Sequence, residues 1–245
     1  MSITPRDLLG NKKKLDKILD FEDIRLEDIS IDDLSFNGNN YDSYINLNSF
    51  LHYVSSCQIS DAFNSIAHRS GVISKLKSIN NLKIWGKVFT CKTDSDDWGT
   101  ITVAIDRAEP NDILLVDVNN MDAAIWGELA SVSAMNRGIK ATFVYGCVRD
   151  MDAILSIGYP IFACGFRPNA GKPLGLGKID VELDLENIKI NSGDFIFGDE
   201  TGVVVIPEKF FNSVILQTFD IKLGEMKISD EINNGISLSH IVGLD

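Results

Sequence analysis

After an N-terminal stretch, the hydrophobic positions of the chain follow two spacings in turn, one typical of helices and one typical of strands. Gln58–His68 has helical spacing with Ser60 or Asp61 as its expected N-cap, and a second helix is expected near residues 98–108. Leu82–Lys92 alternates between inward and outward positions, as a strand does. This succession predicts an α/β protein.

The middle of the chain contains two short, predominantly apolar runs that are typical of buried strands. These runs, Ile113–Val118 and Lys140–Tyr145, flank a segment with helical spacing, Met121–Arg137, which is closed by Gly138. Two buried strands joined by a helix of this length predict a β-α-β crossover with parallel strands. We expect this unit to form the core of the fold.

Short strands and one long helix are expected to complete the domain. The helix runs from Pro207 to about Asn234, and Gly224 is a point at which it could be interrupted. Gly, Pro and Asn turns separate five predicted strands, namely Pro160–Phe166, Val181–Leu185, Asn187–Ile190, Asp194–Gly198 and Val203–Ile206.

Residues 1–55 differ in pattern from the rest of the chain. Acidic residues alternate there with single apolar ones, and Gly-Asn pairs interrupt any long helix. We interpret this segment as an acidic N-terminal extension that packs on the body or on a neighbouring subunit. Residues 56–245 then form the α/β domain, whose length is usual for one domain.

The composition is that of a soluble globular protein, with 44% hydrophobic and 24% charged residues. A net charge of -12 repels phosphate backbones and anionic lipid, so neither nucleic acid nor a membrane is an expected partner. No apolar run reaches the roughly 18 residues of a membrane span, and the N-terminus has no apolar signal core. A cytoplasmic location is therefore expected. Because thiols stay reduced there, the widely spaced cysteines are predicted to be buried free thiols: Cys57, Cys91, Cys147 and Cys164.

Candidate chemistry follows the two predicted parallel strands, because ligands bind beyond the carboxyl ends of such strands in open α/β sheets. Arg149 and Asp150 offer a planar cation for a carboxylate and a hard oxygen ligand for a divalent ion, as a 2-oxo acid site requires. Glu128 either complements a helix dipole or takes part in catalysis, and the amides from Gly127 to Ala130 could cradle an anion. An Arg-Asp pair is also common as a surface ion pair, so these residues alone leave the function open.

Three strings of the chain carry a resemblance to a known family. They occur in the order GELASVSAMNRGIKATFVYGCVRD, PIFACGF and SGDFIFGDETGVVVIPE, with ISDAF and AIDRAEPNDILLVD upstream. Together they resemble the family of the regulator of ribonuclease activity A (RraA) and the 4-hydroxy-4-methyl-2-oxoglutarate aldolases, from about residue 56 to 243. The resemblance implies a swivelling β/β/α fold, assembled as homotrimers or homohexamers with active sites between subunits.

The resemblance also implies a lyase: a class II pyruvate aldolase that cleaves a 4-hydroxy-2-oxo acid and decarboxylates oxaloacetate, with Mg²⁺ or Mn²⁺ as cofactor. Carried over by position, Arg149 grips the pyruvyl group and Asp150 binds the metal ion directly. Glu128 matches an acid that holds metal-bound water, and Glu225 matches one donated by a neighbouring subunit. The substrate carboxylate is received by backbone groups of Gly127, Leu129 and Ala130.

The chain also departs from the family pattern, and two other functions stay open. Cys164 stands where the family commonly has an arginine, and Asp152 is out of phase with a common acidic position. One alternative is a non-catalytic regulator of an RNA-processing enzyme, and another is a biosynthetic enzyme acting on a larger 2-oxo acid or a sugar derivative. A purely regulatory protein has no chemical reason to keep both Arg149 and Asp150, which favours an enzyme.

Two further groups of residues receive structural interpretations. Trp85, Trp98 and Trp126 are expected to fill the core or a subunit contact, with Trp126 as a candidate wall of the pocket. Asp199–Gly202 is expected to form a tight turn between strands.

Overall fold

The computed structural model describes residues 47, 48 and 50–244, which belong to two compact units. One unit comprises Ser55–Phe211, and the other combines the two ends of the chain, Met1–Val54 and Asn212–Asp245. Most of the predicted acidic extension, residues 1–46 and 49, lies outside the described residues. Among the described residues, none of the helices combines the length and the apolar composition that crossing a membrane requires.

The larger unit is built around a nine-stranded sheet with the order β1-β6-β5-β3-β2-β10-β11, in which β4 also pairs with β5 and β7 with β2. Neighbours among β2, β3, β5 and β6 run parallel, whereas β10 is antiparallel to both β2 and β11. A separate hairpin contains β8 and β9. The strands are β1 Lys77–Ser78, β2 Ile84–Thr93, β3 Ile113–Val118, β4 Ala124–Trp126, β5 Ala141–Val148, β6 Ile161–Phe166, β7 Lys178–Ile179, β8 Leu183–Leu185, β9 Ile188–Ile190, β10 Phe195–Gly198 and β11 Val203–Ile206.

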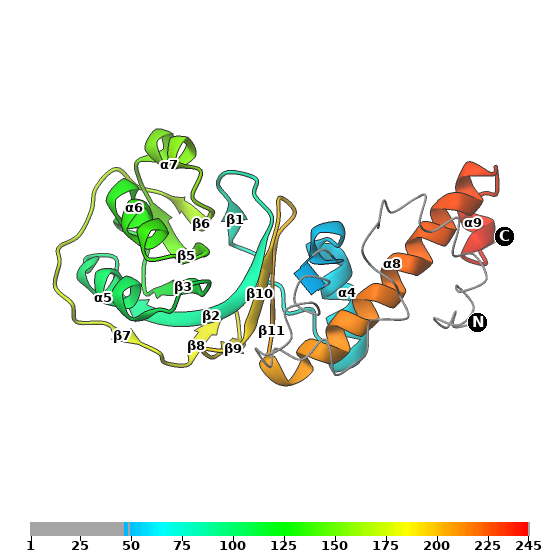
Figure 1. Cartoon of the computed structure of the whole chain (residues 1–245), viewed down its shortest axis with the longest axis horizontal. Coiled ribbons are helices and arrows are strands. Elements are labelled where there is room, and N and C mark those ends of the chain that lie inside the picture. The colour runs from blue at the N-terminus through cyan, green and yellow to red at the C-terminus, as the bar shows by residue number, and fades with distance from the viewer. Residues whose placement is uncertain (1–46, 49, 245) are drawn as a thin grey trace. The chain divides into compact units, whose positions relative to one another are not determined.

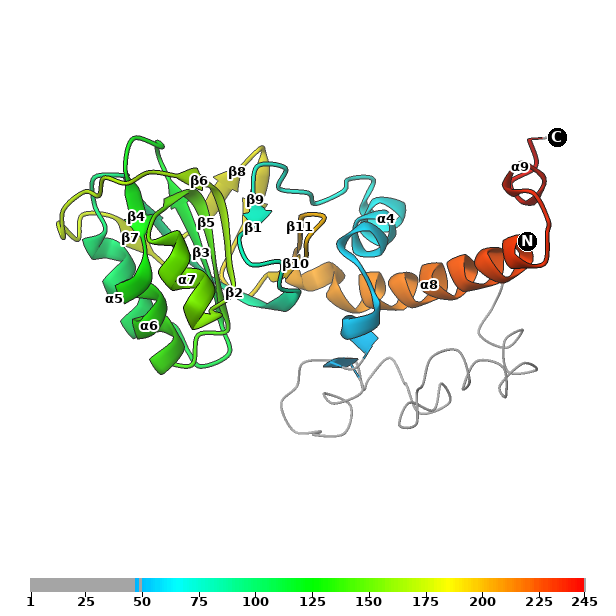
Figure 2. The same ribbon diagram turned by 90° about the horizontal axis from the view of Figure 1, so that it is seen from above.

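Three helices cover one face of the parallel strands, α5 (Gly99–Arg107), α6 (Glu128–Asn136) and α7 (Met151–Ile157) (Figure 1). The view from above shows the three lying side by side along that face (Figure 2). A fourth helix, α4 (Ser56–Ala67), packs against β10 and β11. The parallel strands therefore have a helical layer on the side where α6 connects β3 to β5.

Strand β3 shows why the apolar run Ile113–Val118 is buried on both sides. Leu114 and Val116 point into the core that α5 and α6 cover, whereas Ile113 and Leu115 point into the core on the other face of the sheet. Both faces are thus covered, as is typical of parallel strands. The predicted crossover is confirmed, because β3 and β5 pair in parallel.

The boundaries of the crossover differ from the prediction. The predicted helix from Met121 begins only at Glu128, because Ala124–Trp126 pairs with β5 as the short strand β4. Strand β5 continues to Val148, three residues beyond its predicted end, since this pairing extends it.

The start of α4 was also predicted wrongly. Ser60 and Asp61 lie inside the helix, and Ser55 is its N-cap. The Ser55 hydroxyl accepts the amide of Gln58, and the Gln58 side chain accepts the amide of Ser55, which forms a capping box. This reciprocal pair satisfies two amides at the helix start, so the helix begins five residues earlier than Ser60 would allow.

The predicted turn at Asp199–Gly202 is confirmed and has a second role. The Asp199 carboxylate accepts the amides of Thr201 and Gly202, which closes the turn. It also accepts the amide and the hydroxyl of Ser56 at 2.8 and 2.7 Å. The turn therefore anchors the first residue of α4.

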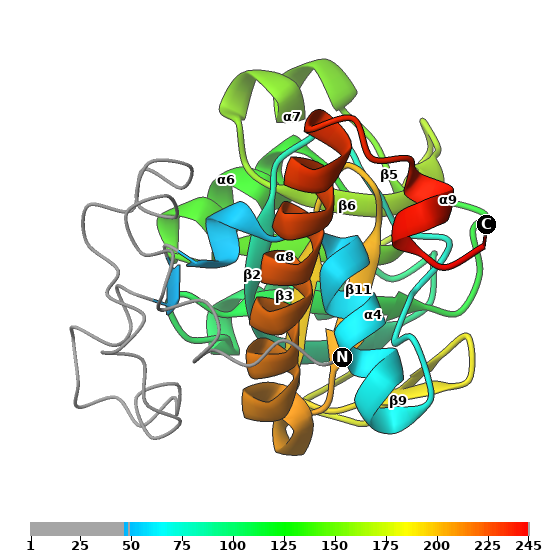
Figure 3. The ribbon, with the colours of Figure 1, turned by 90° about the vertical axis from the view of Figure 1, so that its right-hand side faces the viewer.

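The long predicted helix is α8 (Phe211–Asn233), which follows a 3-10 turn at Glu208–Phe210 and precedes the short α9 (Leu238–Ile241). It runs without a break through Gly224 (Figure 3), so the interruption that glycine allowed does not occur. A single glycine costs a helix only about 1 kcal/mol relative to alanine, which the rest of a long helix easily offsets.

All four cysteines are free thiols, as predicted, but their burial differs. Cys91 and Cys147 are buried in strands and Cys164 is half-buried, whereas Cys57 is exposed on α4. Burial raises the pKa of Cys91 to about 12 and that of Cys164 to about 11. Neither of these two thiols is a nucleophile at neutral pH.

Candidate active site

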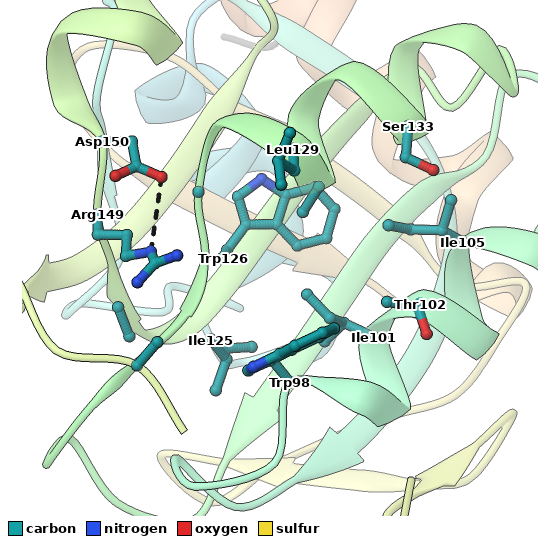
Figure 4. Close-up of a pocket in the computed structure, with 14 residues that line it drawn as sticks. Trp98, Ile101, Thr102, Ile105, Ile125, Trp126, Leu129, Ser133, Arg149 and Asp150 are labelled. Atoms are coloured by element: carbon teal, nitrogen blue, oxygen red, sulfur yellow. Dashed lines mark ion pairs between the residues drawn. The ribbon is translucent and has the colours of Figure 1, made fainter. Parts of the chain in front are cut away.

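A pocket of about 180 Å³ opens where β4 and β5 end (Figure 4). Its walls come from α5, from β4 and the start of α6, and from the residues that follow β5. Five of the predicted site residues are brought together in its lining: Gly127, Leu129, Ala130, Arg149 and Asp150.

The backbone fixes Arg149 and Asp150 at the junction of β5 and α7. The amide of Arg149 donates to the carbonyl of Trp126 at 2.9 Å, which ties this junction to β4. Asp150 occupies the N-cap position of α7 without a side-chain capping hydrogen bond, and it has the left-handed conformation, with φ of 58° and ψ of 44°. Non-glycine residues seldom adopt this conformation, and where they do so in a pocket a functional constraint is a common reason.

The two oxygens of the Asp150 carboxylate have different environments. Oδ2 accepts the amide of Glu128 at 3.2 Å and lies 3.5 Å from Nε of Arg149. Oδ1 accepts no hydrogen bond from any residue that the structure describes. Both side chains are partly exposed, Arg149 by 43% and Asp150 by 39%. One carboxylate oxygen is thus held in place while the other is open to a ligand.

Gly127 permits this close arrangement because it has no side chain. A Cβ atom at this position would lie 2.4 Å from Oδ2 of Asp150 and 3.1 Å from Cγ of Arg149. The first distance is shorter than any real contact, so the carboxylate would have to move.

We expect Gly127→Ala to lower kcat/KM by about 100-fold, the usual effect of displacing a catalytic group by about 1 Å. Pyruvate release from the substrates proposed below measures this loss. Gly202→Ala is the matched control, because a Cβ there meets no atom within 4 Å and the variant should keep its activity. Equal activities of the two variants would show that the placement of the carboxylate is unimportant.

The first turn of α6 presents free backbone amides to the pocket. Ser131 is the first residue whose amide bonds within this turn, to the carbonyl of Gly127 at 3.1 Å. The amides of Leu129 and Ala130 precede it and have no acceptor among the described residues. Such amides at a helix N-terminus are suited to bind an anion.

The remaining two predicted residues lie differently. Glu128 contacts Asp150 through its backbone amide, and its exposed side chain is in the first turn of α6. Glu225 belongs to α8, in the other compact unit, and its role at the site stays a prediction.

One wall of the pocket was missed by sequence reasoning. Helix α5 and the residue before it contribute Trp98, Ile101, Thr102 and Ile105 to the lining. Trp98 packs against the core, as expected, but it is only half-buried and also faces the pocket (Figure 4). The spacing of these four positions marks one stripe of a helix, which is the signal that could have revealed them.

Asp97 holds this wall in place. Its buried carboxylate accepts the Thr100 hydroxyl at 2.7 Å and the amides of Leu174, Gly175 and Leu176 at 2.8–3.0 Å. Burial by itself would raise the pKa of Asp97, but these hydrogen bonds outweigh it and hold the pKa well below its usual range. The ionised carboxylate therefore fastens residues 174–176 to the start of α5.

We expect Asp97→Asn to reduce the free energy of unfolding at pH 7 by about 2 kcal/mol, as the loss of hydrogen bonds to a buried charge does. The folded pKa is depressed, so this contribution is complete above the unfolded pKa of about 3.9 and declines as the pH falls toward the folded value. Urea unfolding should therefore show a smaller difference in the free energy of unfolding between Asp97→Asn and the wild type at pH 3 than at pH 7. Asp96→Asn, at an exposed neighbour, is the control, and an equal effect of both variants would contradict this role.

Comparison with known proteins identifies the family. The model of the RraA-like family, described as Aldolase/RraA, matches residues 56–205. An uncharacterized protein of Methanocaldococcus jannaschii is 36% identical over 68% of this chain and 81% of its own length. A protein of Halalkalibacterium halodurans named "Putative 4-hydroxy-4-methyl-2-oxoglutarate aldolase" is 30% identical over 71% of this chain and 84% of its own length.

Solved structures share the fold. A protein of Pseudomonas syringae pv. tomato aligns with a TM-score of 0.71 at 23% identity, covering 80% of this chain and 92% of that one. The RNA-processing inhibitor RraA from Thermus thermophilis aligns with a TM-score of 0.55 at 22% identity, covering 61% and 92%. These alignments confirm the RraA-like α/β fold, with its parallel β-α-β core, and at such identities they establish the fold alone. The chain therefore belongs to the Aldolase/RraA family.

Proposed function

We propose that this protein is a divalent-metal-dependent pyruvate aldolase, which cleaves a 4-hydroxy-2-oxo acid and decarboxylates oxaloacetate. One observation carries the proposal: the Arg149 guanidinium, the open Asp150 oxygen and the free amides of α6 converge on one pocket. The relatives named as aldolases support the same type of reaction.

The donor atoms at the site fit Mg²⁺ or Mn²⁺. Asp150 offers a hard carboxylate oxygen, and the described residues contain no group of three His, Cys, Asp or Glu side chains that could enclose an ion. Mg²⁺ commonly binds through one or two carboxylates and keeps several waters, so a single direct ligand suits it. When bound, the ion supplies Lewis-acid stabilisation of negative charge on the substrate oxygen.

Binding and orientation of the substrate are assigned to the chain's own groups. The amides of Leu129 and Ala130 receive the carboxylate of the 2-oxo acid, because they point outward from a helix N-terminus. The Arg149 guanidinium faces the pyruvyl oxygen, where it stabilises the negative charge that develops in the transition state. Asp150 keeps the guanidinium in place through the 3.5 Å ion pair.

In the aldol reaction, Glu128 is the candidate base for the proton of the 4-hydroxyl group, and it would act through a water molecule because its exposed side chain is not part of the pocket lining. The C3–C4 bond then breaks, its electron pair passes into the pyruvyl unit as an enolate, and an aldehyde or ketone leaves. The proton taken from the hydroxyl group is then returned to C3, which completes pyruvate. Oxaloacetate loses carbon dioxide through the same enolate and has no hydroxyl proton to remove, so it needs no base.

The test is pyruvate release from oxaloacetate and from 4-hydroxy-2-oxo acids, with Mg²⁺ and with EDTA. The proposal predicts turnover that EDTA stops and that excess Mg²⁺ restores. Full activity in EDTA would contradict the metal requirement. The absence of pyruvate with both Mg²⁺ and Mn²⁺ would contradict the enzyme and favour the non-catalytic regulator.

A further inference from the structure

The pocket has a charged end and an apolar body. Figure 4 shows Arg149 and Asp150 at one end and Ile105, Thr102 and Ser133 at the other. The surface between these ends is formed by Trp98, Ile101, Ile125 and Trp126. A ligand whose 2-oxo acid end binds between Arg149 and the amides of Leu129 and Ala130 would therefore lay the rest of its chain along apolar side chains.

Charge within the pocket is limited to that one end. Arg149 is the one cation, and Asp150 the one anion, among the described residues that line it. A ligand with a second carboxylate farther along its chain would place that charge against isoleucine and tryptophan. An unpaired charge is costly to remove from water, so such a ligand is disfavoured.

The apolar body is built from side chains that are already fixed. The Trp98 backbone amide donates to the carbonyl of Lys172 at 3.0 Å, and its indole Nε1 donates to the carbonyl of Gly171 at 3.1 Å. The indole of Trp126 donates to the Ser131 hydroxyl at 2.9 Å. Ile101 and Ile105 also line the pocket and are only 1% exposed, so packing holds their side chains in place. A preformed surface binds an apolar chain without the entropy cost of ordering side chains.

The size of the pocket restricts its ligand. Its volume of about 180 Å³ is below the roughly 300–1,000 Å³ of sites for drug-sized molecules. A short organic acid suits this volume better than a sugar derivative does.

We infer that the pocket selects short 2-oxo acids whose chain beyond the reacting carbons is uncharged and apolar, and that Trp98 determines this specificity. The inference rests on the proposed function for the direction in which the acid lies. It narrows the substrate class to 4-hydroxy-2-oxo acids that release pyruvate and an aliphatic aldehyde or ketone.

The test compares two acids with chains of six carbons, 2-oxohexanoate and 2-oxoadipate, which differ in a terminal methyl or carboxylate. Neither has a 4-hydroxyl group, so isothermal titration calorimetry with Mg²⁺ measures binding without turnover. We expect 2-oxohexanoate to bind at least about tenfold more tightly than 2-oxoadipate. It should also bind more tightly than 2-oxobutanoate, by about fourfold for each buried methylene.

Trp98→Ala should reduce the ratio of affinities for 2-oxohexanoate and 2-oxobutanoate at least threefold, and Trp98→Phe should give an intermediate ratio. Circular dichroism verifies that each variant is folded. If Trp98→Ala does not fold, the ratio of affinities measured for Trp98→Phe tests the inference. The inference is overturned if 2-oxoadipate binds as tightly as 2-oxohexanoate, if neither binds, or if the ratio is the same in every folded variant. Selective binding without pyruvate release would contradict the proposed function but leave this specificity intact. Pyruvate release without selective binding would contradict the specificity but leave the proposed function intact.

Discussion

Asp150→Asn is expected to abolish metal-dependent pyruvate release. Asparagine has nearly the same size and tolerates the left-handed backbone that Asp150 adopts, so the change mainly removes the negative charge. A neutral amide oxygen is a far weaker ligand for a hard cation than a carboxylate oxygen. Steady-state rates with saturating Mg²⁺ measure the loss, which should bring activity to the level of the wild type in EDTA.

Asp150→Ala provides a second measurement at the same position. It removes the ligand as well, and it also places alanine in the left-handed conformation, at a cost of about 1 kcal/mol in stability. We therefore expect both variants to be inactive and only the alanine variant to be measurably less stable. An Asp150→Asn protein that keeps most of its Mg²⁺-dependent rate would contradict the assignment of Asp150 as the metal ligand.

Arg149→Ala is expected to lower kcat/KM by about 100-fold or more, which corresponds to the roughly 3 kcal/mol that one donor to a developing negative charge supplies. The side chain is 43% exposed, so its removal should change the free energy of unfolding by less than about 0.5 kcal/mol. Initial rates over a range of substrate concentrations give the loss in kcat/KM, and urea unfolding gives the change in stability.

The control is Arg149→Lys, which keeps the positive charge and loses the planar pair of donors. If the positive charge alone stabilises the transition state, Arg149→Lys should recover part of the kcat/KM that Arg149→Ala loses. If the two parallel donors of the guanidinium are required, it should recover little of it. A loss below tenfold in Arg149→Ala would show that the guanidinium does not face the reacting oxygen.

The core of the fold could be predicted because local pattern and burial agree there. Ile113–Val118 is apolar at nearly every position, and the structure covers it on both faces. The three-residue strand β4 and the helix α7 were not predicted, because segments this short show no period. Their existence depends on pairing with β5 and on the left-handed turn at Asp150.

At the site, sequence reasoning found the residues that carry distinctive chemistry and one wall residue, Trp126, but it missed the wall formed by α5. Arg149 and Asp150 stand out because they follow a buried strand directly. Trp98 and Asp97 act through contacts with residues about 75 positions later in the chain, which no local pattern reveals. Gly127 was proposed for substrate binding, and the structure adds that its missing side chain makes room for the Asp150 carboxylate.

A crystal structure with Mn²⁺ and oxalate, a planar analogue of the pyruvate enolate, tests the central claim most directly. Anomalous scattering would locate the ion, and the account predicts it beside Asp150, with oxalate between the Arg149 guanidinium and the amides of Leu129 and Ala130. Manganese and oxalate bound elsewhere, with this pocket empty, would contradict the account.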